Sequence, residues 1–501
     1  MQLVNQYKIN DPRIILKSDL ASEFPIYIYW SKELDIFLYS KSIKNLLNDN
    51  LVKKPLDICN KGLSFLLQSN VVPPPQTSYK DVYILGIGDQ TNVCTIDNKI
   101  DVKFEKTFPF MNFNRLPPEE MKPDENLILE MLAEATLSRI DKSKPSFLFH
   151  SSGKDSNSIA LALAEAGLQN RFTLITHKGE GLSDESEISK KIAKQLGFKH
   201  KIIHKVDELK IEHKQEIENY QNKVTLPSTD GVTLGYPLYA QQISELKNAN
   251  IIDGGGNDSS MMVLPSARDL KFIAISKITH YASFLRNLVK SESLLSPLIR
   301  TPAEWCGMSG MSFSDTKKIF ENAVNVFPYW KEITNSRKSW DIVDFNTSIL
   351  AFNIASELHI RKVRIFADTY DSNLILPFAN EKVATYFAKM PEKYLFDRKK
   401  LKNKLILRKI LKNKIGLDSD ALGKRGWNYQ ANSIIKKNSD WFMKEILSSS
   451  LWNKLEIKKL TNRFLKIILK DSKYYSNFSN RMIYRLYLLS VWKSKNKYLN
   501  Y

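Results

Sequence analysis

The sequence predicts an α/β protein, in which a smaller N-terminal part of α+β type precedes a parallel sheet covered by helices and a helical C-terminal part. Three observations predict this class. Between residues 125 and 204, apolar runs of strand length alternate with amphipathic runs of helix length, which is the pattern of βαβ units. The first 115 residues hold short β-type runs separated by turn signals. From about residue 265 onward the chain is mostly helical in pattern.

The expected elements follow the chain in order. In the N-terminal part, runs rich in aromatic and β-branched residues predict strands at 26–30, 37–40 and 82–87. A Pro-rich break at 116–118 places a linker near 105–122, with domains at 1–115 and 122–501. The second domain is expected to start with helix 125–140, strand 146–150, helix 156–166, strand 172–177, helix 186–196 and strand 201–204.

Composition excludes several classes of protein. The chain has 501 residues, of which 43% are hydrophobic and 26% charged, so it can bury sizeable cores. Its three cysteines are widely spaced and form neither a disulfide framework nor a zinc motif, which favours a reducing cytoplasm. No stretch reaches about 18 apolar residues, and the N-terminus lacks the pattern of a secretion signal. The chain is therefore expected neither to span a membrane nor to be exported.

Basic residues outnumber acidic ones by 74 to 54, which gives a net charge of +20. Such an excess attracts nucleic acid, acidic lipid or a polyphosphate substrate. It is concentrated, however, in Lys-rich helical stretches such as 399–414 and 454–473, and none of the modular nucleic-acid-binding signatures is present. No nucleic-acid partner is expected.

The most informative stretch is an apolar strand that leads into a small polar loop and directly on into a helix. The loop contains Ser151, Ser152, Gly153, Asp155 and Ser156. Small residues let the backbone wrap an anion, while hydroxyls and free helix N–H groups donate hydrogen bonds to phosphate oxygens. An acidic side chain in such a loop repels phosphate unless a divalent cation lies between them, so Asp155 is predicted as a Mg²⁺ ligand. The alternative is an ordinary helix N-cap at Asp155 or Ser156.

This loop lacks the Gly-Lys-Ser/Thr ending of a Walker A sequence. It resembles the Ser-Gly-Gly-x-Asp-Ser loop of the PP-loop ATP pyrophosphatases, with Ser152 in place of the first glycine. Stretches at 183–187, 197–200 and 227–230 follow in the order seen in asparagine-synthetase-like enzymes. The resemblance implies a PP-loop (adenine-nucleotide α-hydrolase-like) sheet, with ATP and Mg²⁺ as cofactors.

A second strand and glycine-rich loop, at 251–258, looks like the Ser-Gly-Glu-Gly-x-Asp motif of that family. The resemblance implies that Asp258 is a second Mg²⁺ ligand and that Gly254 belongs to the nucleotide site. Two acidic loops after two parallel strands can hold metal ions that bridge the ATP phosphates. The alternative is a structural turn whose glycines need positive φ.

Three C-terminal segments continue the resemblance in the family's order. Residues 373–380 resemble its Glu-x-Arg-x-Pro-Phe-Leu-Asp segment, residues 404–408 its Lys-x-x-Leu-Arg helix, and residues 424–426 its Lys-x-Gly loop. The resemblance implies that Lys424 reaches the reacting centre and stabilises negative charge in the transition states. It also implies that Lys404 and Arg408 face the pyrophosphate. The alternative for each cation is a solvated surface charge.

The N-terminal domain resembles the family's glutaminase domain, through residues 65–77 followed by 82–85. A glutaminase of this kind uses a Cys as the mature N-terminal residue, with its own α-amine as the base. Position 2 is Gln2, and the nearest cysteine is Cys59. The domain is therefore expected to be a degenerate Ntn glutaminase that liberates no ammonia and has a structural or docking role.

Without internal ammonia, the attacking amine is expected to come from the substrate itself. β-Lactam and carbapenam synthetases, one ring-closing branch of the family, carry a Tyr at the third position of the second loop and a Glu before Pro-Phe. The corresponding residues here are Gly255 and Asn373. The glycine is expected to leave room for a bulkier acyl adenylate, such as a peptide. The whole chain is most similar to the other branch, the lasso-peptide macrolactam synthetases of the microcin J25 type.

That resemblance implies a cytoplasmic, AMP-forming carbon–nitrogen ligase of bacteriocin biosynthesis. It would adenylate an Asp or Glu side-chain carboxylate of a core peptide, close a macrolactam with the peptide's N-terminal amine, and release AMP and pyrophosphate. The implied partners are the precursor peptide, a maturation protease that removes its leader, and an exporter. Glu357, Tyr370 and Asp371 are considered as acceptors of the amine proton, with none preferred.

Three alternatives stay open. The first is an ammonia-dependent asparagine-synthetase-like ligase, or a β-lactam-synthetase-like one, acting on small molecules. The second is modification of tRNA bases by a PP-loop enzyme, which the charge of +20 would suit. The third is a non-catalytic scaffold, in which Ser152 and Gly255 are signs of decay.

Overall fold

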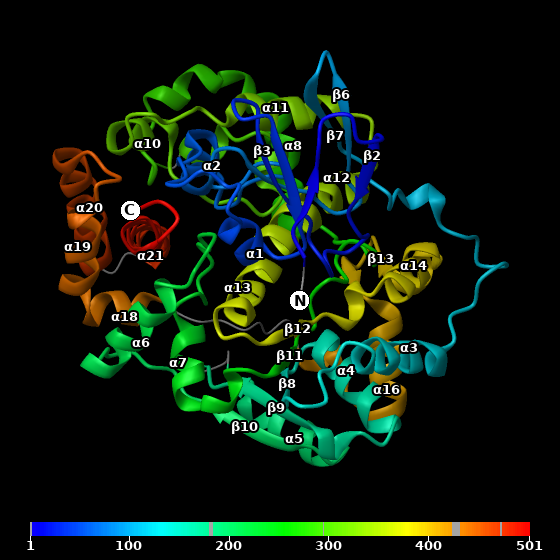
Figure 1. Cartoon of the computed structure of the whole chain (residues 1–501). Coiled ribbons are helices and arrows are strands. Elements are labelled where there is room, and N and C mark those ends of the chain that lie inside the picture. Colours follow the sequence, from blue (N-terminus) through cyan, green and yellow to red (C-terminus); the bar gives the residue numbers. More distant parts are fainter. Residues whose placement is uncertain (1–2, 180–183, 294, 423–430, 471–472, 501) are drawn as a thin grey trace.

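A computed structural model describes residues 3–179, 184–293, 295–422, 431–470 and 473–500. Its centre is a five-stranded sheet in the order β10–β9–β8–β11–β12, in which every neighbouring pair is parallel (Figure 1). The strands are β8 (Ser146–Phe149), β9 (Phe172–His177), β10 (Lys199–Ile203), β11 (Asn250–Ile252) and β12 (Asn373–Ile375). The α/β class predicted from the sequence is confirmed.

Helices cover both faces of this sheet, because its strands direct alternate side chains into two cores. In β8, Leu148 lies in one core, whereas Phe147 and Phe149 lie in the other. The Leu148 side is covered by α3 (Glu125–Leu137), α4 (Lys154–Glu165), α5 (Ser186–Leu196) and α16 (Leu405–Ile415). The Phe149 side is covered by α6 (Ile211–Gln221), α7 (Gly235–Gln242) and α13 (Arg361–Thr369).

The N-terminal part contains two antiparallel sheets. One has the order β1 (Asn5–Tyr7), β4 (Ile36–Ser40), β3 (Tyr27–Ser31) and β5 (Val82–Ile84), and the other β2 (Ile14–Lys17), β6 (Gln90–Ile96) and β7 (Lys99–Glu105). In β3, Ile28 and Trp30 pack with residues of the second sheet. Tyr27 and Tyr29 pack on the other side with α1 (Ile43–Asn48) and α2 (Asn60–Ser69). The core that contains Tyr27 and Tyr29 continues into the sheet domain. The domain boundary at 115–122 stays a prediction.

The rest of the described chain is mostly helical. Between β11 and β12 lie α8 (Ala267–Thr279), η5 (His280–Asn287), α9 (Leu295–Leu298), η6 (Ala303–Trp305), α10 (Phe313–Ile319), α11 (Phe327–Ser336), α12 (Ile342–Ile349), the π-helical segment η7 (Leu350–Ile360) and α13. After β12 come η8 (Pro377–Ala379), α14 (Glu381–Lys389), α15 (Glu392–Leu395), the hairpin β13 (Phe396–Asp397) and β14 (Lys402–Asn403), α16, α17 (Ser419–Leu422), α18 (Ala431–Lys437), α19 (Ser439–Ser448), α20 (Lys454–Leu469) and α21 (Lys473–Lys495). Besides η5, η6 and η8, 3₁₀-helical turns lie at η1 (Asn112–Asn114), η2 (Gln169–Arg171) and η4 (Ser244–Leu246).

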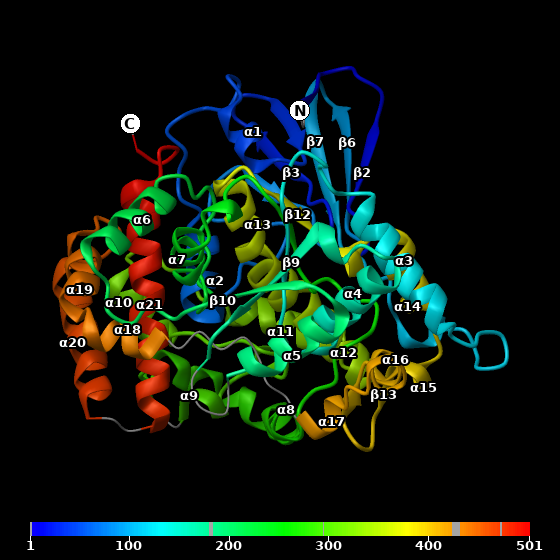
Figure 2. The same ribbon diagram turned by 90° about the horizontal axis from the view of Figure 1, so that it is seen from below.

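The C-terminal helices α18 to α21 gather on one side of the molecule, away from α3, α14 and α16 (Figures 1 and 2). Helix α21 ties this group to the other parts. The Tyr484 hydroxyl accepts a hydrogen bond from the backbone N–H of Leu234 at 2.8 Å, and Arg485 donates to the carbonyl of Leu67 at 3.0 Å. Helix α21 therefore contacts both the N-terminal part and the sheet domain.

The predicted elements agree with the structure in type and differ at their ends. Strand 172–177 and helix 186–196 match β9 and α5, whereas helix 156–166 begins two residues earlier, at Lys154. Helix ends depend on capping, which sequence patterns locate only to within a residue or two. The hairpin of β6 and β7 was not predicted, although its turn residues Asp97 and Asn98 both adopt the positive φ typical of tight hairpin turns.

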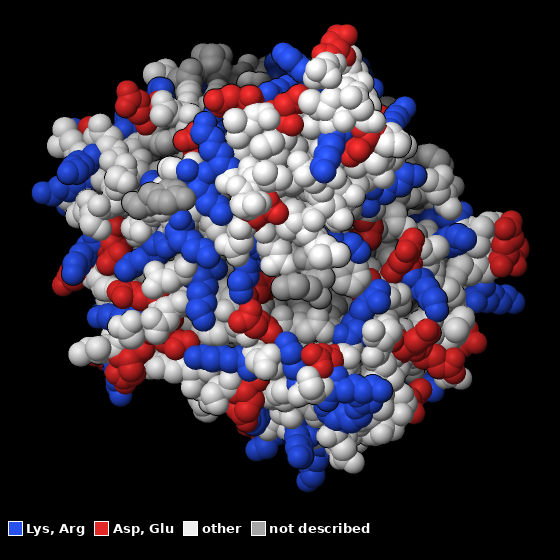
Figure 3. Space-filling model, viewed as in Figure 1, with Lys and Arg blue, Asp and Glu red and all other residues white. Residues whose placement is uncertain are grey.

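Charges are mixed on the face seen in Figure 3. Lys and Arg lie between Asp and Glu across that face, so the excess of 20 positive charges is not collected into one patch there. Within the stretches that the structure describes, no helix is both long and apolar enough to cross a membrane.

Candidate active site

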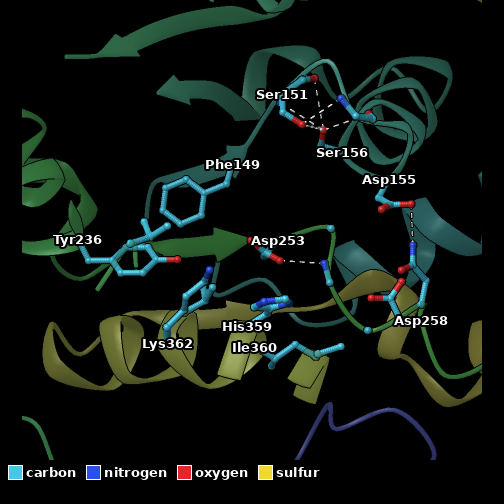
Figure 4. Close-up of a pocket in the computed structure, with 18 residues that line it drawn as sticks. Phe149, Ser151, Asp155, Ser156, Tyr236, Asp253, Asp258, His359, Ile360 and Lys362 are labelled. Carbon is cyan, nitrogen blue, oxygen red and sulfur yellow. Dashed lines mark hydrogen bonds between the residues drawn. The ribbon is translucent and has the colours of Figure 1, made fainter. Parts of the chain in front are cut away.

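A cavity of about 350 Å³ lies where β8 and β11 end (Figure 4). These strands are neighbours, with Phe147 opposite Ile251, so the loops that follow them emerge side by side. Helix α7 and the helical stretch formed by η7 and α13 complete the walls. Open parallel sheets bind ligands beyond the carboxyl ends of their strands. The volume of this cavity falls within the range of about 300–1,000 Å³ that is typical of small-molecule sites.

The loop after β8 is held in shape by its own hydroxyls. The N–H of Ser151 donates to Ser156 Oγ at 3.2 Å, and the N–H of Gly153 donates to Ser151 Oγ at 3.0 Å. Asn157 braces the loop by donating to the carbonyls of Ser151 and Gly153 at 2.9 and 2.7 Å. Ser151, Gly153, Asp155 and Ser156 all line the cavity. The loop and the first turn of α4 therefore present the donors that bind phosphate oxygens.

Asp155 and Asp258 meet at a buried lysine. The Lys404 ammonium lies 2.8 Å from Asp155 Oδ2 and 3.2 Å from Asp258 Oδ1. It also donates to Asn257 Oδ1 at 2.9 Å, and Asn257 Nδ2 donates to Asp155 Oδ1 at 2.7 Å. Because the N-cap of α4 is Gly153, Asp155 lies inside the first turn and is not a helix cap. The tertiary structure thus brings the two predicted metal ligands to one cation.

Glycines allow the two acidic loops to approach this closely. A Cβ on Gly254 would lie 3.1 Å from Asp155 Cβ. Gly256 has a φ of +96°, and a Cβ there would lie 2.7 Å from that of Ala379. The turn after β11 therefore requires glycine at positions 254 and 256, and this turn positions Asp258.

The oxygen atoms around Lys404 fit the predicted metal ion. Burial disfavours the charge on Lys404, but the carboxylates of Asp155 and Asp258 outweigh this effect and raise its pKa. Carboxylate and amide oxygens are the ligands that Mg²⁺ prefers, and Mg²⁺ in nucleotide sites commonly uses one or two carboxylates together with substrate phosphates. Among the described residues no group of three or more His, Cys, Asp or Glu could hold a metal alone. A Mg²⁺ ion held by Asp155 and Asp258 would thus need the nucleotide phosphates as well.

One comparison with known families bears on this geometry. The family model of asparagine synthase matches residues 127–492, which include the parallel sheet, both acidic loops and Lys404. The chain belongs to the asparagine synthase family. Members of this family are ligases that convert ATP to AMP, typically with Mg²⁺. No curated protein matches the sequence.

Two site predictions drawn from the asparagine synthase resemblance, Ser152 and Arg408, do not fall at the cavity. Ser152 Oγ donates to Glu185 Oε1 at 2.7 Å, and Ser152 is not among the residues that line the cavity. The Arg408 guanidinium pairs with Asp420 and donates to the carbonyl of Asn403, so it is engaged away from the cavity. Lys424 lies outside the described residues. Lys404 contacts the acidic pair, and its predicted contact with pyrophosphate stays a prediction.

The far end of the cavity holds charged residues that sequence reasoning did not assign to the site. Asp253 follows β11 directly and points into the cavity (Figure 4). Lys362 on α13 donates to Asp230 Oδ1 at 2.8 Å, and His359 Nε2 lies 4.0 Å from Asp230 Oδ2. Tyr236 on α7 completes this end. An acid directly after a strand was a usable signal for Asp253, whereas nothing in the sequence indicated Lys362.

Two side chains lie close to Gly255. A Cβ on Gly255 would lie 3.0 Å from Asp253 Oδ1 and 3.3 Å from Ile360 Cγ1. A side chain at this position would thus meet Asp253 and Ile360 at once, while Gly255 itself lines the cavity. The expectation that this glycine leaves room for a bulkier acyl adenylate stays a prediction. Asn373, aligned with the Glu of the β-lactam branch, begins β12 and donates to the carbonyl of Arg139 at 2.6 Å, at the opposite end of the sheet from the cavity.

Other residues considered from the sequence also have partners elsewhere. Glu357 pairs with Arg361, the Tyr370 hydroxyl donates to Glu216 at 2.7 Å, and Asp371 lies 3.0 Å from the Lys44 ammonium. None of the three considered residues lines the cavity.

In the N-terminal part, Cys59 caps α2 by accepting a hydrogen bond from the Gly62 N–H. The family match begins at residue 127, so the resemblance of the first 115 residues to a degenerate glutaminase stays a prediction.

Proposed function

We propose that the protein is an ATP-dependent ligase that adenylates a side-chain carboxylate of a peptide and closes a macrolactam with the peptide's N-terminal amine. In lasso-peptide maturation this reaction yields the ring, AMP and pyrophosphate. The amide-forming, ATP-dependent class follows from the asparagine synthase family. The peptide substrate is the proposed part.

The observation that carries the adenylation step is the meeting of Asp155 and Asp258 beside the phosphate loop. The hydroxyls of Ser151 and Ser156 and the first-turn N–H groups of α4 lie on one side of the cavity, where they would bind the phosphates of ATP. Asp155 and Asp258 would hold Mg²⁺, which when bound shields phosphate charge during attack on the α-phosphorus. The substrate carboxylate would then attack that phosphorus, giving an acyl adenylate and pyrophosphate.

The source of the attacking amine supports a ring-closing reaction. Ammonia made by a glutaminase needs a cysteine nucleophile. Of the three cysteines of the printed sequence, Cys59, Cys94 and Cys306, Cys59 accepts the capping hydrogen bond at the start of α2 and Cys306 is buried. An amine carried by the substrate removes the need for that chemistry. Holding the peptide with its amine and acyl group in contact would be the main catalytic task, since orientation alone can supply several kcal/mol of the barrier.

The test is an incubation of the purified chain with ATP, Mg²⁺ and a candidate precursor peptide whose leader has been removed. We expect peptide-dependent release of AMP and pyrophosphate, and a peptide product that has lost one water by mass spectrometry. A parallel incubation with ATP, aspartate and ammonia separates the small-molecule alternative. AMP formation in that second incubation, with none from peptides, would favour an asparagine-synthetase-like ligase and overturn the peptide proposal.

A further inference from the structure

Asp253 lies in the middle of the cavity, and one of its carboxylate oxygens accepts no hydrogen bond from the described residues. Its Oδ1 accepts a hydrogen bond from the N–H of Gly255 at 2.8 Å. No other group in the described parts of the chain donates to this carboxylate, and Figure 4 shows it directed into the cavity. Position 253 corresponds to the Ser that opens the resembling Ser-Gly-Glu-Gly-x-Asp motif. A carboxylate here is therefore a feature of this chain, and it faces the space between the phosphate loop and the charged far end.

The carboxylate of Asp253 occupies space next to the third position of the loop. Its Oδ1 lies 3.0 Å from the point where a Cβ on Gly255 would be. In the β-lactam branch the third position carries the Tyr of the ring-closing dyad, and here that position has no side chain. Asp253 thus brings an acidic group to the place where the missing side chain would begin.

Burial and the neighbouring charges shift the pKa of Asp253. Burial raises the pKa of Asp253, the Gly255 N–H and the Lys362 ammonium oppose that rise, and Asp155 across the cavity adds to it. Lys362 is itself held by Asp230 at 2.8 Å. The other titratable groups that line this cavity are Asp258, Tyr236 and His359. A carboxylate whose pKa is raised is a stronger base, and one that also faces a cavity can serve as a general base there.

The other candidates at this end are less suitable. Asp230 is engaged with Lys362 and with the N–H of Val232. The side chain of His359 is 52% exposed and leans toward Asp230 at 4.0 Å. Asp155 and Asp258 are committed to the Lys404 cation. Among the described carboxylates that line the cavity, Asp253 is the one left with an acceptor oxygen that no protein group uses.

We propose that Asp253 is the base that takes the proton from the attacking amine in the second half of the reaction, an inference that rests on the proposed function. The amine arrives neutral, having lost its first proton to solvent. Its nitrogen attacks the acyl carbon, the carbon–nitrogen bond forms, and the second N–H proton passes to the Asp253 carboxylate. The bond between the acyl carbon and the AMP oxygen then breaks, and AMP leaves with that electron pair.

The experiment separates the two halves of the reaction in Asp253→Asn. Peptide-dependent exchange of labelled pyrophosphate into ATP reports adenylation, and mass spectrometry reports ring closure. We expect exchange within about 3-fold of the wild type and closure slowed by about 10²-fold or more, the usual contribution of a general base. Hydroxylamine, a nucleophile that is neutral and reactive at pH 7, should trap the acyl adenylate equally well in both proteins.

Two further variants sharpen the test. Asp253→Glu keeps a carboxylate and should recover part of the closure rate, and the acid limb of the pH–rate profile for closure should be present in Asp253→Glu and absent in Asp253→Asn. Asp89→Asn is the matched control, because burial also raises the pKa of that carboxyl, to about 6, in a different part of the molecule. It should leave the ratio of exchange to closure unchanged.

The outcomes are distinct. A wild type that exchanges pyrophosphate, paired with an Asp253→Asn variant that closes the ring at the same rate, overturns this inference alone. Loss of exchange in both Asp253 variants overturns it too, because Asp253 would then serve the nucleotide or adenylation. Absence of peptide-dependent exchange in the wild type overturns the proposed function, and the inference falls with it.

Discussion

Replacing Lys404 by Met tests whether its ammonium is the cation that holds Asp155 and Asp258 together. The Lys404 side chain is 7% exposed, and those of the two aspartates are 31% and 32% exposed. Removing one partner of a buried ion pair costs about 3–5 kcal/mol, and partial exposure of the remaining charges reduces that cost. We therefore expect Lys404→Met to lower the free energy of unfolding by about 2–3 kcal/mol.

Thermal unfolding with and without Mg²⁺ measures this effect. Unfolding entropy grows with chain length, so in a chain of 501 residues such a loss lowers a cooperative Tm by about 2–3 °C. Because Mg²⁺ can supply the missing positive charge between the aspartates, it should raise the Tm of Lys404→Met more than that of the wild type. The pH must be held constant; since the pKa of Lys404 is raised, its contribution is complete at neutral pH and is lost only as pH rises through the folded pKa.

Lys402→Met is the matched control, two positions away. Lys402 lies 2.8 Å from Asp420, but both side chains are at least 40% exposed, so its loss should cost less than about 1 kcal/mol. Equal Tm values for Lys404→Met and the wild type, or an equal response of both to Mg²⁺, would refute the reasoning.

Three more outcomes are expected. Asp155→Ala should reduce peptide-dependent pyrophosphate release by about 10²-fold or more with an unchanged circular dichroism spectrum, because it removes a predicted metal ligand; near-normal release would contradict the metal assignment. Gly256→Ala should destabilise the chain by about 1–3 kcal/mol, since its φ is +96° and its Cβ would lie 2.7 Å from that of Ala379, whereas Gly167→Ala, with φ of +72° and open space, should cost less in the same thermal scan. Burial lowers the pKa of His150 from 6.5 to about 4, so the folded chain favours the neutral ring; stability is complete above pH 6.5 and should fall by roughly 3 kcal/mol toward pH 4. A His150→Gln variant should show a shallower fall of Tm over that range, and identical slopes would argue against it.

The sequence was most informative where the chemistry is local. The loop from Ser151 to Ser156 and the turn that carries Asp258 were both predicted, because a strand, a few small residues and an acid form a pattern within about ten residues. Asp253 lies in the same stretch, yet the charges that act on its pKa come from Asp155 and Lys362, which are far from it in the sequence. Nothing in the sequence indicated that these three groups line one cavity.

What the sequence determined by itself is the set of strands, helices and glycine-rich turns, since strand and helix periodicities and turn residues act over short distances. It also carried the order of motifs that indicates the asparagine synthase family. Only the tertiary structure decided which of these pieces meet: that β8 and β11 are neighbours, that Lys404 lies between the two aspartates, and that Arg408 pairs with Asp420. Periodicity shows which face of an element is apolar. Which distant face it packs against depends on the combined shape and charge of many residues far apart in the chain.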